Sequence, residues 1–290
     1  MNKINKLVVI GVGLIGGSFA LSLRREGLVG RVVGVGRGMA NLERALGLGI
    51  IDEACTDAAQ AVDGADLVIL ACPVGQMPAQ MQAIAPHLSD TALISDVGST
   101  KQDVVAMARE HLGRHLPRFV PAHPIAGAEQ SGAQAARFGL YEGKNVVLTP
   151  LPETDPFAIE TLNDLWLACG ARINTMSPAA HDAVFAAVSH LPHLLAFALV
   201  DEIAHKPNSK QCFHFAASGF RDFTRIASSH PEMWRDISLA NRDALITELA
   251  EYQAQLQRVQ AMLEHRDAEG LQQMFDIART ARNAWLDTLK

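Results

Sequence analysis

Short runs of β-branched and other apolar residues alternate with amphipathic stretches along the first half of the chain. The amphipathic stretches predict helices, for example at 18–26, 39–48 and 101–111. Strands that alternate with helices are typical of a mostly parallel sheet covered on both faces. The apolar runs predict strands at 6–10, 31–35, 67–70, 92–95, 119–122, 145–148 and 172–175.

The pattern changes near Ser177-Pro178, and from there to Lys290 it predicts helices alone. The clearest helix begins near Pro231 and, if it is continuous, reaches Leu263. Such a helix is longer than a small helical domain needs for its own core. The stripe of apolar side chains along it could therefore pack in the core or form a subunit interface. The apolar positions recur at spacings of three and four, at Ile246, Leu249, Tyr252, Leu256, Val259 and Leu263.

A length of 290 residues suggests two domains, which we place at 1–176 and 177–290. The chain has 25 Lys and Arg against 31 Asp and Glu, a net charge of −6. This mild acidity argues against a nucleic-acid partner and against polybasic docking on a membrane.

The four cysteines include no C-x-x-C pair. We therefore expect reduced thiols in a cytoplasmic protein.

A glycine-rich turn, Gly11-Val12-Gly13-Leu14-Ile15-Gly16, follows the first expected strand and opens a helix. In a dinucleotide-binding unit Gly11 permits the tight turn, Gly13 lets the backbone approach a pyrophosphate, and Gly16 lets helix and strand pack closely. The helix start, with Leu14 and Ile15, offers amides to the phosphates. The alternative is a structural turn in another α/β protein. The full strand–turn–helix–strand unit favours an α/β Rossmann-type doubly wound sheet.

The segment after the second expected strand reads Val35-Gly36-Arg37-Gly38 and contains no acid. An Asp or Glu there would bind the ribose 2′-hydroxyl of NAD, whereas Arg37 is placed to pair with a 2′-phosphate. The sequence therefore favours NADP, or use of both cofactors. The alternative is that Arg37 is a solvated surface arginine with no role at the cofactor.

Two further segments, Asp96–Lys101 and His123–Gly127, each follow an expected strand and should lie at the carboxyl edge of the sheet, where such folds bind ligands. A histidine just beyond a strand end can accept a proton near neutral pH, although a core or capping histidine is the alternative.

The helical half holds Ser189–His193 and the pair Arg221 and Arg225. The two arginines are four apart, hence on one helical face, and suit a substrate carboxylate unless they form surface salt bridges. His190 and His193 could form half of a metal site, but no Asp, Glu or Cys accompanies them, so we expect no metal.

Taken in order, five segments of the chain resemble the prephenate/arogenate (cyclohexadienyl) dehydrogenase family. They are Gly11–Gly17, Asp96–Lys101, His123–Gly132 (HPIAGAEQSG), Ser189–His193 (SHLPH), and Arg221–Ile226 with Met233–Ile237 (RDFTRI…MWRDI). The resemblance implies a Rossmann domain followed by an all-helical C-terminal dimerisation domain, and hence a homodimer.

The resemblance also implies roles for single residues. His123 would accept the proton of the ring C4 hydroxyl, and Ser99 would orient that hydroxyl or His123 beside the cofactor. Arg225 would bind a substrate carboxylate, oriented by Asp222. The remaining residues expected at the substrate are Arg221, His193, Ser189 and Glu129, the last near the site entrance.

The implied reaction is oxidative decarboxylation of prephenate to 4-hydroxyphenylpyruvate, of L-arogenate to L-tyrosine, or of both, with hydride transfer to NAD(P)⁺. The substrate choice stays open. Alternatives are another two-domain dehydrogenase of the β-hydroxyacid or imine reductase type, or a non-catalytic NADP-binding sensor.

The first strand begins close to Met1 and helices fill the C-terminal part. We therefore expect no fused mutase or regulatory domain, so any L-tyrosine feedback would act at the active site.

Overall fold

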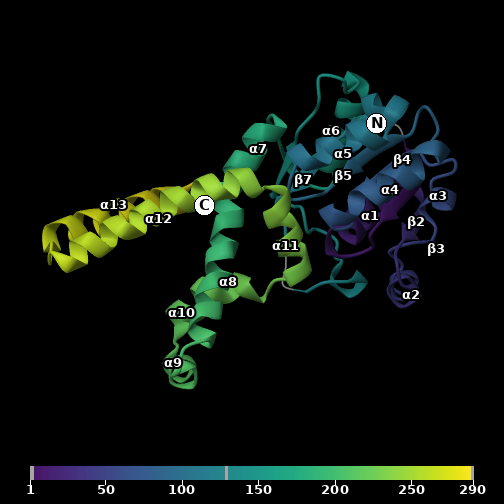
Figure 1. Cartoon of the computed structure of the whole chain (residues 1–290). Coiled ribbons are helices and arrows are strands. Elements are labelled where there is room, and N and C mark those ends of the chain that lie inside the picture. The colour runs from purple at the N-terminus through teal and green to yellow at the C-terminus, as the bar shows by residue number, and fades with distance from the viewer. Residues whose placement is uncertain (1–2, 128–129, 289–290) are drawn as a thin grey trace. The chain divides into compact units, whose positions relative to one another are not determined.

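The computed structural model describes residues 3–127 and 130–288 (Figure 1). Its contacts divide the chain into two compact units, Met1–Arg242 and Asp243–Lys290. The first unit holds the sheets and the helices around them, and the second is a pair of helices. The domain boundary that we expect at residue 176 lies inside the first unit.

The first unit is built on a six-stranded sheet in the order β3-β2-β1-β4-β5-β6, in which every neighbouring pair is parallel. This order reverses direction between β1 and β4, which places a ligand crevice at the carboxyl ends of these strands. The strands are β1 (Ile4–Ile10), β2 (Val29–Val35), β3 (Glu53–Cys55), β4 (Leu67–Leu70), β5 (Leu93–Asp96) and β6 (Phe119–Val120).

Helices cover both faces of this sheet because alternate residues of each strand point to opposite sides. From β1, Leu7 and Val9 join a core with α1, α2 and α6, whereas Val8 and Ile10 join a core with α3, α4 and α5. Helices α4 and α5 lie side by side (Figure 1). The helices are α1 (Leu14–Arg25), α2 (Met39–Gly47), α3 (Ala58–Ala61), α4 (Met77–Ile84), α5 (Gln102–His111) and α6 (Pro156–Ala168).

Short 3₁₀ turns link several of these elements: η1 (Val74–Gln76), η2 (Ala85–His87), η3 (Gly113–Arg118) and η4 (Ala133–Ala135). Local caps explain several helix starts. Asp57 caps α3, Asp155 caps α6 and Ser177 caps the next helix, each accepting hydrogen bonds from backbone amides of the first turn.

A second sheet of three strands is formed by β7 (Ala122–Pro124), β8 (Asn145–Leu148) and β9 (Arg172–Thr175). The single strand expected at 119–122 is wrong, because the chain leaves the first sheet after Val120 and enters the second at Ala122. Pro121 lies between them and has no amide hydrogen for a ladder. His123 is consequently not beyond a strand end, as we expected, but inside β7, opposite Val147 of β8.

From residue 177 onward the described chain is helical, as expected. The first unit contains α7 (Pro178–Phe185), the π-helical turn η5 (Ala186–His190), α8 (Leu191–Ala204), α9 (Ser209–Phe215), α10 (Ser218–Thr224), η6 (Arg225–Ser228) and α11 (Pro231–Ala240). The second unit contains α12 (Arg242–Glu264) and α13 (Ala268–Asp287).

The helix expected near Pro231 does begin there, but it is not continuous to Leu263, because it is broken at Asn241 into α11 and α12. Asn241 is buried, and its side-chain amide donates to the carbonyl oxygen of Asp182 and contacts Nδ1 of His190. The side chain of Asn241 thus connects the end of α11 to α7 and η5, and the chain restarts as α12.

Within the described residues, the helical run Pro178–Ala204 is long and apolar enough to cross a membrane by length and composition. This is weak evidence, because the core helix of a soluble protein meets the same criteria. The run also carries three buried polar side chains, those of His181, Asp182 and His190.

Candidate active site

The glycine-rich turn joins β1 to α1 at the reversal point of the sheet. Gly11 has a φ of +103°, and a Cβ there would lie 2.5 Å from the carbonyl oxygen of Ala71. At Gly16 a Cβ would lie 2.6 Å from Cγ1 of Val9. These two positions require glycine for the turn and for helix–strand packing.

Gly13 differs, because nothing lies within 4 Å of the Cβ that it lacks. It is the N-cap of α1 and provides no side-chain cap for the amides that follow, at Leu14 and Ile15. Open space in front of uncapped helix amides suits a pyrophosphate. The turn therefore fits a dinucleotide.

Asn41 of α2 holds the turn from one side. Its amide nitrogen donates to the carbonyl oxygen of Val12 (2.7 Å), and its Oδ1 accepts from the amide of Ala133 (2.9 Å). Arg37 is exposed on the loop after β2, at the same edge of the sheet. Asn41 is a residue that the sequence pattern did not single out, since an asparagine in an exposed helix carries no distinctive signal.

A buried carboxylate organises the loop that follows β5. Asp96 accepts hydrogen bonds from the amide of Gly98 (2.7 Å) and from the amide of Ala122 (3.3 Å). It also forms an ion pair with Lys101, and neither side chain is exposed. Burial raises the pKa of Asp96, and the Lys101 ammonium opposes that effect. Asp96 thus connects the loop containing Ser99, which is half-buried, to the start of β7.

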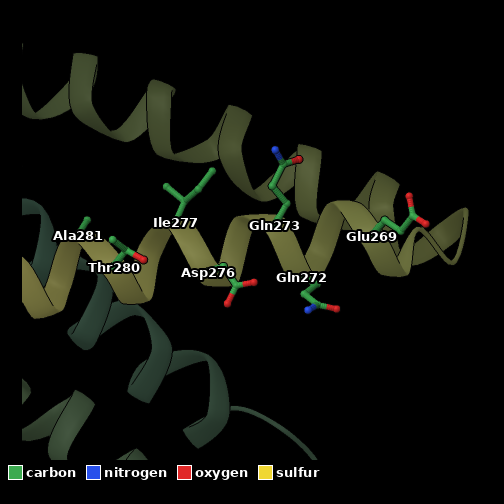
Figure 2. A pocket seen from close by; sticks show the side chains of 7 residues that line it. All are labelled: Glu269, Gln272, Gln273, Asp276, Ile277, Thr280 and Ala281. Atoms are coloured by element: carbon green, nitrogen blue, oxygen red, sulfur yellow. The ribbon is translucent and has the colours of Figure 1, made fainter.

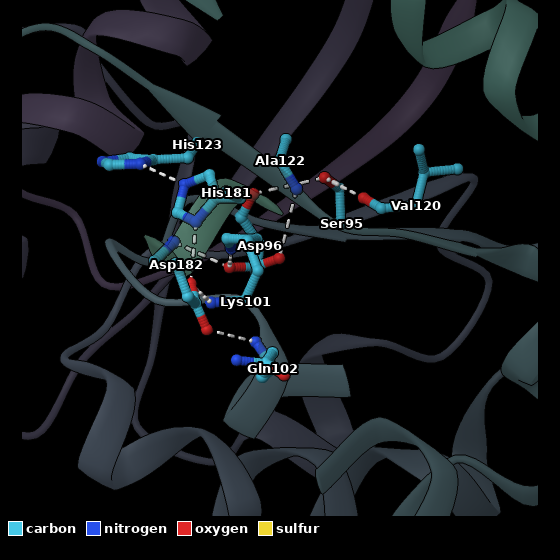
Figure 3. Close-up of polar contacts among 10 residues, drawn as sticks. Ser95, Asp96, Lys101, Gln102, Val120, Ala122, His123, His181 and Asp182 are labelled. Atoms are coloured by element: carbon cyan, nitrogen blue, oxygen red, sulfur yellow. Dashed lines mark hydrogen bonds and ion pairs between the residues drawn. The ribbon is translucent and has the colours of Figure 1, made fainter. Parts of the chain in front are cut away.

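His123 on β7 meets His181 of α7 (Figure 3). Its Nδ1 lies 2.8 Å from Nε2 of His181, and Nδ1 of His181 lies 2.8 Å from Oδ1 of Asp182. Phe185, one turn later, packs on both imidazoles, with ring centroids 4.9 Å from His123 and 4.4 Å from His181. The structure thereby links the β7 histidine to the helical half of the chain.

The environment keeps His123 neutral at physiological pH. Burial lowers its pKa well below the ordinary histidine value, and the nearby His181, Lys101 and His190 lower it further. A neutral imidazole has one unprotonated ring nitrogen, which can accept a proton. This is the state that a general base requires.

His190 and His193 from the SHLPH segment lie at the start of α8, near Trp234 of α11. Burial lowers the pKa of His190 to about 4. His193 stacks on Trp234 with centroids 3.6 Å apart, and its Nδ1 donates to the carbonyl oxygen of Ser189 (2.9 Å). Because a carbonyl only accepts, neutral His193 carries its proton on Nδ1 and exposes Nε2 as an acceptor.

The three charged residues near position 222 lie on two successive helical elements. Arg221 lies in α10, which ends at Thr224, and Arg225 has helical backbone angles and begins the 3₁₀ turn η6 that follows directly. Asp222 accepts a hydrogen bond from its exposed neighbour Arg221 (3.3 Å). Arg225 lies close enough to His193 for its charge to lower that pKa, after the larger effect of burial. Arg225 and His193 are therefore brought together.

Glu129 lies outside the described residues. His181 and Asp182 were not identified from the sequence, although a His-Asp pair just after the expected Ser177-Pro178 helix start is a recognisable signal. Their significance depends on β7, and a sequence pattern does not show which strand a helix contacts.

A surface hollow elsewhere lies along α13, lined by Glu269, Gln272, Gln273, Asp276, Ile277, Thr280 and Ala281 (Figure 2). These side chains include no imidazole or cysteine, and Asp276 pairs with Arg279. The hollow thus lacks the chemistry of the histidine cluster. Across the described residues, we find no group of three His, Cys, Asp or Glu side chains arranged for a metal ion.

Comparison with known protein families identifies the family to which this fold belongs. Residues 19–175 match the prephenate dehydrogenase nucleotide-binding domain, and residues 177–277 match the prephenate dehydrogenase dimerization domain. The chain belongs to the prephenate dehydrogenase family. The resemblance inferred from the five sequence segments is confirmed, and so is the Rossmann-type fold followed by helices.

Individual relatives agree with this assignment. The chain is 38% identical over 286 residues to the prephenate dehydrogenase of Bacillus subtilis, covering 98% of this chain and 77% of that one. It superposes with a TM-score of 0.90 on prephenate dehydrogenase from A. aeolicus, solved with hydroxyphenyl propionate and NAD⁺, at 37% identity over 96% of this chain and 97% of that one. Synechocystis arogenate dehydrogenase superposes at 0.80 with 30% identity, covering 97% and 99%.

Proposed function

We propose that the chain is an NAD(P)-dependent dehydrogenase that oxidatively decarboxylates prephenate, L-arogenate or both, in tyrosine biosynthesis. The observation that carries the proposal is a neutral imidazole, His123, bonded through Ala122 and Asp96 to the carboxyl edge of a dinucleotide-binding sheet. Membership of the prephenate dehydrogenase family supports the same reaction.

The reaction requires removal of a hydride from the alcohol carbon and of a proton from the hydroxyl oxygen that it carries. When bound, the nicotinamide accepts the hydride from ring C4. His123 takes the C4 hydroxyl proton as the carbonyl forms. The ring carboxylate then leaves as CO₂, its electron pair makes the ring aromatic, and His123 returns the proton to the phenolate oxygen. No proton is gained or lost overall, and aromatisation drives the step forward.

The remaining site residues hold the substrate. We assign a substrate carboxylate to Arg225, because a guanidinium is a strong bidentate partner for a carboxylate and this one lies beside His193. Nε2 of His193 and the Ser189 hydroxyl, four residues apart in the chain, would offer further polar groups to the substrate. Ser99, on the loop held by Asp96, would orient the C4 hydroxyl or His123. Gly11, Gly13, Leu14, Ile15 and Gly16 would hold the pyrophosphate.

We also propose a preference for NADP over NAD. Arg37 is exposed at the carboxyl edge beside the glycine turn, and Gly36 and Gly38 flank it without an acid. An Arg there favours a 2′-phosphate, and an acid repels it. The Arg37→Asp variant should lose NADP affinity about tenfold or more while retaining NAD. Equal NADP affinity in the variant and the parent would reject the preference.

One assay tests the proposed reaction and its rivals. Reduced nicotinamide is followed by absorbance with prephenate or L-arogenate, and with NADP⁺ or NAD⁺, in all four combinations. We expect turnover with at least one substrate and faster turnover with NADP⁺. Cofactor binding without turnover of either substrate would instead support a sensor, and turnover of hydroxyacids or imines alone would support another dehydrogenase.

Three properties of the whole protein belong to the same proposal. We place the enzyme in the cytoplasm, since its four free cysteines suit a reducing compartment. We propose a homodimer, since the helical half matches a dimerization domain. L-tyrosine should inhibit by competing for the active site, because it is the product formed from L-arogenate and shares the phenol ring of 4-hydroxyphenylpyruvate. Inhibition that is not competitive with the substrate would contradict this site of feedback.

A further inference from the structure

The contacts of His123 extend inward through two residues that have no role in the reaction described above. His181 lies between His123 and Asp182, with hydrogen-bond distances of 2.8 Å on both sides (Figure 3). His181 is fully buried and Asp182 nearly so. The three side chains therefore form one chain of polar contacts that is shielded from water.

The direction of each hydrogen bond follows from Asp182. Besides Nδ1 of His181, its two oxygens accept from the backbone amides of Lys101 and Gln102, each at 2.8 Å. Burial acts to raise the pKa of Asp182, but these hydrogen bonds outweigh burial and the pKa is lowered. Asp182 is therefore a carboxylate, which can only accept.

The protonation of both imidazoles follows. His181 must carry a proton on Nδ1 to donate to Asp182. Burial lowers the pKa of His181, so it is neutral and its Nε2 is an acceptor. Nδ1 of His123 then carries the proton that His181 accepts, and Nε2 of His123 is left unprotonated.

We propose that His181 and Asp182 are positioning residues that hold His123 in the tautomer with its proton on Nδ1 and a free lone pair on Nε2. This inference rests on the proposed role of His123 as the base for the C4 hydroxyl. Only a nitrogen without a proton can act as that base, and a histidine free to exchange tautomers would spend part of its time inactive.

The surrounding packing keeps the geometry of this chain. Phe185 packs on both imidazoles. Asp182 is fixed from the other side by the first residues of α5, which continue from the loop that contains Ser99. Its carbonyl oxygen accepts from the buried amide of Asn241. Helix α7 thus carries the tautomer control from the helical half onto β7.

The first test reads the tautomer directly and does not depend on turnover. In protein labelled with ¹⁵N-histidine, protonated and unprotonated ring nitrogens are distinguished by their shifts and couplings, and His123→Asn identifies the His123 signals. We expect the proton on Nδ1 of His123 at neutral pH in the full chain. A proton on Nε2 would overturn the inference, whatever substrate the enzyme uses.

The second test uses two matched substitutions. In His181→Asn the amide takes the place of Nδ1 and can still donate to Asp182, but nothing reaches His123. In His181→Gln the amide oxygen takes the place of Nε2 and can accept from His123. We expect kcat to fall on the order of 10²-fold in His181→Asn, within the range of a general base. It should recover largely in His181→Gln, with KM unchanged in both.

The outcome separates tautomer control from a structural role. If His181 only supports the fold, both variants lose thermal stability and activity together, with no advantage for Gln. Equal kcat in the two variants with the His123 tautomer unchanged would overturn the inference. Turnover of neither substrate by the parent protein would reject the proposed function, while the ¹⁵N measurement would still decide the tautomer.

Discussion

Among single residues, His123 has the environment that determines the pH behaviour of the site. Its pKa is lowered well below the ordinary value near 6.5, chiefly by burial. The base is active when neutral, so activity is complete above the lowered pKa and is lost as the pH falls through it. The acid limb of the kcat/KM profile should therefore lie below the ordinary histidine range.

His123→Asn should lower kcat by about 10²–10⁴-fold, because the amide cannot accept the hydroxyl proton. Cofactor affinity should stay at the parent value, since His123 lies on β7 and the glycine turn lies after β1. Steady-state kinetics and a cofactor fluorescence titration check the two parts. Turnover close to that of the parent would remove His123 from the role of base.

Arg225→Ala should raise the apparent KM for the substrate about 10–100-fold, the range for loss of a charge-assisted hydrogen bond to a carboxylate. The KM for the cofactor should stay unchanged. Arg114→Ala is the matched control, because Arg114 is an exposed arginine of η3, after the end of α5, and is paired with Asp90. Weaker cofactor binding without a substrate effect would contradict the assignment.

At the scale of elements, two connections hold the parts of the site together. The buried Asp96 joins the β5–α5 loop to β7, and Asp182 joins α7 to the start of α5. Breaking a buried ion pair such as Asp96–Lys101 leaves an unpaired charge and costs about 3–5 kcal/mol. The loop of Ser99 is thus fixed from both of its ends.

The turn between β1 and α1 offers a matched pair of glycine substitutions. Gly13→Ala should leave the melting temperature unchanged, because its Cβ meets nothing within 4 Å, but it should weaken cofactor binding about tenfold or more by filling the space for a pyrophosphate. Gly11→Ala should lower the melting temperature, since its Cβ would meet backbone atoms of Ala71 and its φ is +103°. Unchanged cofactor affinity in Gly13→Ala would show that the pyrophosphate lies elsewhere.

For the whole molecule, the exposed apolar side chains of the second unit bear on the oligomeric state. Both helices of the second unit expose large apolar side chains, including Ile246, Leu263 and Ile277, each more than half exposed. Exposed apolar faces of this kind mark interaction surfaces. A second copy of the chain is the occupant we expect, in keeping with the dimerization domain.

Light scattering after size exclusion should therefore give the mass of a dimer at micromolar concentration. Ile277→Arg, in the hollow on α13, should shift the protein toward monomer, whereas Gln260→Arg on an exposed polar position should not. A parent protein that runs as a monomer would contradict the homodimer.

Much of the fold was predictable from local patterns in the sequence. The strands at 67–70 and 145–148 have the expected bounds, because each is a local run of mostly buried apolar residues. The strand at 172–175 also has the expected bounds, although most of its residues are exposed. The short edge strand β3 was missed, since its half-buried residues Glu53–Cys55 form no apolar run. The break at Asn241 was also missed, because the contacts of Asn241 with Asp182 and His190 are distant in sequence.

The sequence by itself determined the alternation of strands and helices, the glycine turn and the family, because these depend on residues close together in the chain. Only the tertiary structure decided that His123 lies inside β7 and that His181 and Asp182 lie behind it. Fifty-eight positions separate His123 from His181. A hydrogen bond over that distance depends on how α7 packs on the second sheet, and no local pattern of apolar and polar residues records that packing.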